Sequence, residues 1–320
     1  MVNHVKVVGS VVLAVVIAVV IIPQIQQSYT ISYGSYPILS NNWWEALNWI
    51  KNNTEECSVI ATYWDPGHFI RAIAQRSIVF DGASQGMTRT IEVNSTNLSE
   101  QEIKDIAVLD NYKIEVDKGR GTTKIMTARI QDIATSMFTD NEATSVRLLE
   151  KYKKPGCNSL YFLATSDLIG KSVWWSYFST WRPGESGKQY SYSIIQLSQE
   201  GKTDDGGDVS VYSINGQQAI LIYKKGDTIK PLLQDGNGVA EISRLLYVSP
   251  NGEAKIQENK NSTIPGLVWM SSDKRVIVFI PPEIENSVFT KMFLLEGFGL
   301  NKFKLVKSWG GEVKLFKVEV

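Results

Sequence analysis

The 320-residue sequence lacks the residues and motifs of several common enzyme classes. Its only histidines, His4 and His68, are too few to form a zinc cluster. Neither glycine-rich phosphate-binding motif, G-x-G-x-x-G or G-x-x-x-x-G-K-[ST], is present. Residues 82–86 match G-x-S-x-G, but both histidines precede Ser84, whereas a hydrolase of that type needs its histidine after the serine. We interpret this stretch as a glycine-rich turn, and the chain as a binding platform without a self-sufficient active site.

Net charge is also absent, because 33 basic residues balance 33 acidic ones. A nucleic-acid partner is therefore not expected, since such partners select basic surfaces. The nine tryptophans are many for this length, and some occur in pairs, as at Trp43-Trp44 and Trp174-Trp175. Paired aromatic residues suit an amphipathic binding site or a membrane interface.

One apolar run, residues 5–22, is long enough to suggest a membrane segment. Val7 to Ile22 is uncharged, which gives about 24 Å of helix against a hydrocarbon core of about 30 Å, and Lys6 can extend it by snorkelling. A cleaved signal peptide is the alternative, but no clear small-x-small site ends the run. We predict a retained transmembrane helix in residues 1–23. The positive-inside rule then places the rest of this single-pass chain on the extracytoplasmic side of the cell membrane.

Two features agree with an external location. The two cysteines, Cys57 and Cys157, are an even number in a compartment that permits disulfides. Four N-x-[ST] sequons accept glycans only outside the cytoplasm, although chance produces about two or three in such a chain. They begin at Asn52, Asn94, Asn97 and Asn261.

Beyond the first helix we predict two regions. Residues 24–204, which begin with a polar connector over 24–40, alternate strands with helices; such alternation is typical of a parallel sheet with crossover helices. Residues 82–122 form a polar, mostly surface insertion within this α/β domain. Residues 205–320 are expected to form a β-rich module, with turns at Asn215-Gly216, Asn251-Gly252 and Gly310-Gly311. The fold class is thus a transmembrane helix, a mixed α/β domain with parallel strands, and a β-rich module.

Two predicted strands, 58–62 and 159–164, each lead into a polar turn and then a helix. Trp64 and Asp65 follow the first strand, and Asp167 with Lys171 follows the second. In open α/β sheets, ligands bind at the carboxyl edge of the strands. Asp167 and Lys171 are one helical turn apart and can pair. Each feature also has a purely structural interpretation. The first turn would be a Pro-Gly turn with packed aromatic residues, and Asp167 with Lys171 would be an ordinary surface ion pair.

The same arrangement predicts a disulfide at the opposite edge of the sheet. Cys57 and Cys157 lie just before these two strands. If the strands are parallel neighbours, the two thiols come close enough to bridge. The bond would close a loop of about 100 residues and contribute at most about 4–5 kcal/mol in the chain-entropy model.

Residues Tyr63–Gly67 (YWDPG) resemble the W-W-D-x-G motif of the catalytic subunit of oligosaccharyltransferase, nearest to the archaeal AglB type. The order of the neighbouring features is similar too. Trp43-Trp44 precede the motif, Phe80-Asp81-Gly82 follow it, and residues 166–171 (SDLIGK) resemble the family's Asp/Lys motif. The resemblance extends from the last transmembrane helix of that family to the end of this chain.

The resemblance implies a role for the first motif in recognising an acceptor polypeptide. Trp64 and Asp65 would hydrogen-bond the hydroxyl of Ser or Thr in an Asn-X-Ser/Thr sequon. Tyr63 stands where the family usually has its first tryptophan, and Gly67 matches the motif's glycine. A site built to bind a hydroxyl rejects analogues without one, because its own polar groups would then be unpaired.

For the second motif, the resemblance implies that Asp167 and Lys171 support the hydroxyl pocket. Trp175 occupies the position, usually Met or Ile, that would contact the threonine methyl group. With Trp in place of Met or Ile, the resemblance no longer implies the methyl contact or a preference for threonine over serine.

The family's catalytic carboxylates and its divalent metal, Mn or Mg, lie in loops of a large multi-pass membrane domain upstream. The resemblance therefore implies that this chain is the C-terminal part of such an enzyme, with no catalytic residue and no metal ligand of its own. Its partners would be the acceptor polypeptide, a dolichol-type lipid-linked oligosaccharide and the upstream membrane domain. We expect no glycan transfer by the chain alone. The alternative is a single-pass surface protein with extracellular binding modules.

Overall fold

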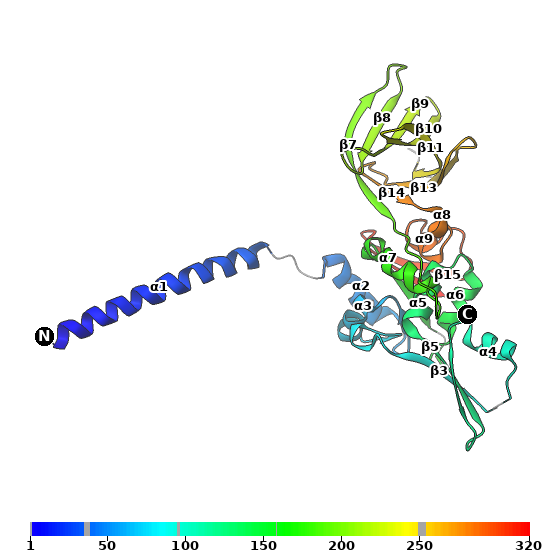
Figure 1. Cartoon of the computed structure of the whole chain (residues 1–320), viewed down its shortest axis with the longest axis horizontal. Helices are drawn as coiled ribbons and strands as arrows, with labels where there is room; N and C mark the ends of the chain where they lie inside the picture. Colours follow the sequence, from blue (N-terminus) through cyan, green and yellow to red (C-terminus); the bar gives the residue numbers. More distant parts are fainter. Residues whose placement is uncertain (1, 35–38, 95–96, 158, 249–253) are drawn as a thin grey trace. The chain divides into compact units, whose positions relative to one another are not determined.

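The computed structural model describes residues 2–34, 39–94, 97–157, 159–248 and 254–320 (Figure 1). The chain divides into two compact units, Met1–Trp44 and Glu45–Val320. The predicted turn at Asn251-Gly252 lies outside the described residues.

The first unit contains helix α1, Val2–Gly34. By length and composition, the described part has one helix apolar enough to cross a membrane, Val15–Tyr33. The helix continues beyond residue 23, where the sequence predicted a polar connector from residue 24. Pro23 lies inside it, and a proline removes only one backbone hydrogen bond, so flanking residues can continue a helix through it. Helix α2, Asn41–Asn53, spans the boundary between the units.

The second unit contains a five-stranded sheet that positions the two sequence motifs. Strand β1 pairs in parallel with β2 and with β6, as predicted. Every residue of β1 and β6 is buried, which is typical of parallel strands covered on both faces. Two further strands, β15 and β16, extend the sheet beyond β6, and β16 is antiparallel to it. The bounds are β1 Val59–Ala61, β2 Ser77–Ile78, β6 Leu160–Thr165, β15 Phe303–Trp309 and β16 Val313–Val318.

Helices follow β1 and β6 directly. Helix α3, Trp64–Phe69, continues into a π-helical turn η1, Ile70–Ala74, and helix α7 is Asp167–Thr180. Their apolar residues and those of the sheet share one core with the remaining helices. These are α5 Arg129–Phe138, α6 Glu142–Glu150, α8 Pro282–Glu285 and α9 Val288–Phe293.

The insertion predicted over residues 82–122 has more regular structure than its polar composition indicated. It contains a short helix, α4, and also a three-stranded antiparallel sheet in the order β3-β5-β4. The edge strand β4 is fully exposed, although its sequence, KIEVD, alternates charged and apolar residues as a strand does. The elements are η2 Gly82–Ser84, β3 Thr88–Val93, α4 Glu100–Ala107, β4 Lys113–Asp117 and β5 Thr122–Ala128.

Most of the remaining strands form a barrel (Figure 1). Seven strands are ordered β10-β9-β8-β7-β14-β13-β11, and pairing of β10 with β11 closes the ring, while β12 adds to β11 outside it. The predicted hairpin around Asn215-Gly216 is confirmed as β8–β9. The bounds are β7 Ser193–Lys202, β8 Asp208–Ser213, β9 Ala219–Lys225, β10 Thr228–Asp235, β11 Gly238–Val248, β12 Ala254–Glu258, β13 Ile264–Met270 and β14 Val276–Ile280.

Residues 205–320, predicted as one β-rich module, are divided in the structure. The barrel begins earlier, with β7 at Ser193, and ends at Ile280. Residues 303–318 then return to the five-stranded sheet. The reason is burial, because the first four residues of β16 are all buried beside β6, whereas a barrel strand would bury one face only.

Candidate functional site

The two motifs lie at the same edge of the five-stranded sheet. Ala61 of β1 pairs with Phe162 of β6 in parallel register, so the turns that follow these strands are neighbours. Helix α3 begins at Trp64 and helix α7 at Asp167. The structure therefore brings together side chains that are about one hundred residues apart in the sequence.

Lys171 joins the two turns. Its ammonium lies 2.8 Å from Asp65 Oδ2 and 2.9 Å from Asp167 Oδ2. Each of the three side chains is about two-fifths exposed, so solvent screens the pairs and they add little to stability. Their effect is positional, because one cation fixes both carboxylates at the rim of the sheet.

Tyr63 lies beneath this ion group. It is 1% exposed, its hydroxyl donates a hydrogen bond to Asp167 Oδ2, and its ring lies 5.1 Å from the Lys171 ammonium. Thr165, the last residue of β6, donates to the other oxygen of Asp167. Sequence reasoning missed Thr165; its place directly before the second motif was the available signal.

The electrostatics keep Asp167 and Lys171 ionised. Burial tends to raise the pKa of Asp167, but hydrogen bonds from Thr165, Tyr63 and Lys171 outweigh it and hold that pKa below its usual value. Burial tends to lower the pKa of Lys171, yet its bonds to Asp65 and Asp167 leave it raised. Burial, followed by the negative charge of Asp167, also raises the pKa of Tyr63, so this phenol stays protonated and remains a donor.

Trp64 presents a half-buried indole beside Asp65. Its ring packs on Trp175 at a centroid distance of 4.8 Å and on Phe178 at 6.0 Å. Among the described residues, its indole N–H has no hydrogen-bond acceptor. The start of α3 therefore carries one donor without an acceptor among the described residues, followed by one carboxylate acceptor.

The sequence placed Trp175 among the substrate-binding residues but put its contact with the threonine methyl group in doubt. In the structure Trp175 has no exposed surface. It packs against Tyr63, Trp64 and Phe80. This large side chain therefore supports the Trp64 indole.

Gly67 allows α3 to lie directly against the chain after β2. A Cβ atom at this position would be 2.8 Å from both the Asp81 Cβ and the Phe80 carbonyl oxygen. Asp81 is buried and binds Arg71 at 3.0 Å. Its hydrogen bond from Ser84 is the main cause of its lowered pKa. Asp81 thus anchors the C-terminal side of the motif, and His68 lies near it at 3.8 Å.

The opposite edge of the sheet contains the disulfide between Cys57 and Cys157, with a Cα–Cα distance of 6.0 Å. With Glu55 these sulfurs form the only group of three potential metal ligands among the described residues. Both sulfurs are oxidised, so they cannot bind a metal as thiolates. At the motif edge, Lys171 already occupies the space between Asp65 and Asp167, so this pair does not fit a divalent cation.

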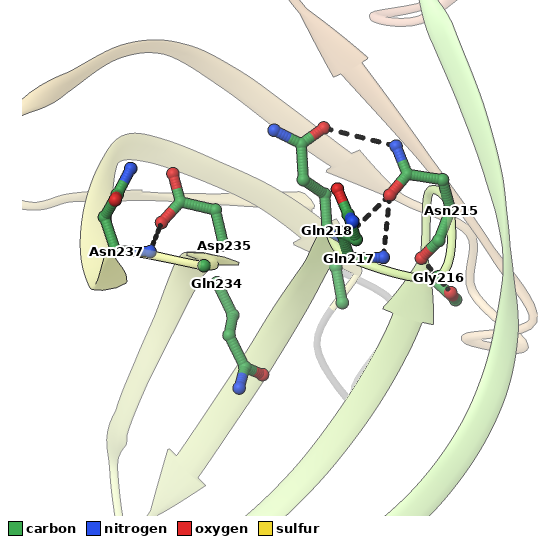
Figure 2. A pocket seen from close by; sticks show the side chains of 10 residues that line it. Asn215, Gly216, Gln217, Gln218, Gln234, Asp235 and Asn237 are labelled. Carbon is green, nitrogen blue, oxygen red and sulfur yellow. Dashed lines mark hydrogen bonds between the residues drawn. The ribbon is translucent and has the colours of Figure 1, made fainter.

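A separate polar recess of about 800 Å³ lies between two hairpin turns of the barrel (Figure 2). The Asn215 side-chain oxygen accepts from the backbone N–H groups of Gln217 and Gln218. Asp235 accepts from the Asn237 backbone in the same way. Because these oxygens close their own turns, we ascribe the recess to turn geometry.

Two curated archaeal proteins match most of the chain. A dolichyl-phosphooligosaccharide-protein glycotransferase of Methanocaldococcus jannaschii is 25% identical over 90% of this chain. One from Methanococcus voltae is 22% identical over 87%. The chain spans 34% and 36% of the lengths of these relatives. No protein-family model matches. The resemblance found in the motifs is thus confirmed over nearly the whole chain.

Two solved structures are more distantly similar. The C-terminal globular domain of an oligosaccharyltransferase from Pyrococcus abyssi has a TM-score of 0.46 at 14% identity, covering 86% of this chain and 50% of that one. The C-terminal domain of PglB from C. jejuni has a TM-score of 0.45 at 15% identity, covering 87% and 99%. At these scores neither structure bears on the function.

Proposed function

We propose that the chain is the acceptor-recognition part of a membrane oligosaccharyltransferase, in which Trp64 and Asp65 bind the hydroxyl of an Asn-X-Ser/Thr sequon. The similarity to archaeal glycotransferases supports a role in protein glycosylation. The observation that carries the finer proposal is that α3 begins with two consecutive residues of complementary chemistry: Trp64, whose indole N–H has no acceptor among the described residues, and Asp65, whose carboxylate is half-exposed.

The chemistry of this pair complements a hydroxyl group. A Ser or Thr hydroxyl is one donor and one acceptor. Asp65 accepts the hydroxyl proton, and the Trp64 N–H donates to the hydroxyl oxygen. Because Lys171 contacts Oδ2 of Asp65, the described residues supply no hydrogen-bond partner for Oδ1. A sequon analogue without the hydroxyl would leave both groups unpaired, which costs about 1–3 kcal/mol when they are desolvated.

The surrounding residues position these two groups. Trp175 and Phe178 hold the Trp64 ring, while Lys171 ties Asp65 to α7. Asp167 and Tyr63 hold Lys171 in turn. The recognition groups thus rest on rigid elements, which suits a site that must discriminate by a single hydroxyl.

Transfer of the glycan is assigned elsewhere in the enzyme. The carboxylates at the motif edge do not fit a divalent metal, so Mn or Mg would be bound by an upstream multi-pass membrane domain, together with the dolichol-type lipid-linked oligosaccharide. We infer that the globular unit faces the extracytoplasmic side, and that the chain alone transfers no glycan. Metal-dependent transfer by the isolated chain would contradict this assignment.

Peptide binding tests the proposal. Saturation-transfer NMR on the chain would compare an Asn-X-Thr peptide with its Asn-X-Val analogue, in which only the hydroxyl is replaced. Trp64→Phe removes the N–H and keeps a ring, and Asp65→Asn removes the charge. Both should weaken Thr-peptide binding about tenfold or more. Trp174→Phe changes an exposed tryptophan of α7 and serves as the matched control. Unchanged binding in both site variants, with folding intact, would favour a surface protein with other ligands.

A further inference from the structure

A second cavity, of about 590 Å³, lies between the barrel and the turn that follows α9. This volume is in the range of small-molecule sites. Its walls come from β11, β12 and β13 on one side and from residues 294–298 on the other. Apolar side chains dominate, and two of them, Ile256 and Phe298, are 49% and 74% exposed at the mouth.

One cation lines this apolar cavity. Lys314 of β16 is 6% exposed. Its ammonium donates to the Phe293 carbonyl oxygen at 2.9 Å and to Glu296 Oε1 at 3.0 Å. An ammonium has three donors; two go to these oxygens, the ammonium also lies 5.2 Å from the centroid of the Phe293 ring, and the described residues supply no oxygen acceptor for the third donor. A buried charged group with an unused donor is costly unless another acceptor binds there.

Glu296, the counter-ion of Lys314, lies at the protein surface. Glu296 is 66% exposed, whereas Lys314 is almost completely buried. An exposed carboxylate is well solvated and loses little when another anion replaces it. The buried member of this ion pair is the cation, its carboxylate partner is exposed, and the walls are mostly apolar; this combination suits an anion attached to a hydrocarbon chain.

We propose that this cavity binds a single-chain amphiphile with an anionic head group, such as a fatty carboxylate or an alkyl phosphate. The head group lies against Lys314, and the chain packs on Leu246, Trp269 and Leu295 and leaves past Phe298. The candidate membrane span of the same chain makes lipids of this kind available to it. The site is independent of sequon recognition, because none of its residues belongs to the two motifs.

The test uses the full chain in nanodiscs of zwitterionic phosphatidylcholine, with empty nanodiscs to subtract partitioning. The probe is decanoate with a photoreactive diazirine, and mass spectrometry locates the labelled residues. Labelling should saturate, map to residues at the cavity, and be displaced by decanoate and decyl phosphate. Decyltrimethylammonium, with the same chain and the opposite charge, should not displace it. Unsaturable labelling or displacement by either charge would refute the proposal.

Variants separate the head-group contact from the apolar walls. Lys314→Met keeps the length of the side chain and should weaken decanoate binding about tenfold or more while decanol binding is retained. Lys304→Met removes an exposed lysine of β15 and should have no effect. Glu296→Gln removes the competing carboxylate and should tighten decanoate binding, which keeps the test decisive if Lys314→Met unfolds. The proposal is refuted if the Glu296 variant binds decanoate as the parent chain does and Lys314→Met either binds it equally or unfolds. The third donor of the Lys314 ammonium would then face only water.

Discussion

The close approach at Gly67 predicts a large effect of adding one methyl group. In Gly67→Ala, the new Cβ would lie 2.8 Å from the Phe80 carbonyl oxygen, which is backbone and cannot rotate away, and 2.8 Å from the Asp81 Cβ. Helix α3 must therefore move. Overpacking of a buried site costs about 1–3 kcal/mol. We expect the free energy of unfolding to fall by that amount, and sequon binding to weaken because Trp64 and Asp65 begin α3.

Urea unfolding followed by circular dichroism measures this change, and Gly170→Ala is its control. Gly170 is exposed in α7, and a Cβ there meets nothing within 4 Å. Alanine should stabilise the helix by about 0.5–1 kcal/mol, so the two identical substitutions should shift the urea midpoint in opposite directions. If Gly67→Ala leaves the midpoint unchanged, or shifts it as Gly170→Ala does, α3 has room for the added methyl group.

Three further predictions concern stability. Replacing Cys57 and Cys157 by serine should lower the free energy of unfolding by at most about 4–5 kcal/mol, since the bond closes a loop of 100 residues; thermal melts with and without reductant check this. Arg89→Met leaves the fully buried Asp132 carboxylate without its cation and should cost about 3–5 kcal/mol, whereas adding Asp132→Leu should restore part of that loss. The lowered pKa of Asp167 means that its contribution is complete above the unfolded carboxyl pKa of about 3.9 and is lost as pH falls further. Asp167→Asn should therefore flatten the acid limb of the stability profile below about pH 4, and an unchanged limb would contradict the assignment.

The parallel strands and their two edges could be predicted from the sequence because the signals are local. Buried runs at 58–62 and 159–164, each followed by a polar turn, were enough to place Asp65 near Lys171. The same register placed Cys57 next to Cys157.

The features that the sequence did not predict depend on contacts between distant segments. The return of β16 to pair with β6, and the pairing of β7 with β14, join strands that lie far apart in the sequence, so no local pattern predicts them. The burial of Trp175 was missed for a related reason. Its helix carries aromatic residues on several faces, and only the packing of Tyr63, Trp64 and Phe80 shows which of them is inside.

A double-mutant cycle between Asp65 and the sequon hydroxyl tests the central proposal most directly. Dissociation constants of Asn-X-Thr and Asn-X-Val peptides would be measured by NMR for the parent chain and for Asp65→Asn. If the carboxylate binds the hydroxyl, replacing Thr by Val should weaken binding to the parent chain by about 1 kcal/mol or more, and should weaken binding to the variant by less, because a neutral amide then replaces the charged acceptor. If the binding free energies of the Thr and Val peptides differ by the same amount in both proteins, Asp65 does not bind the hydroxyl.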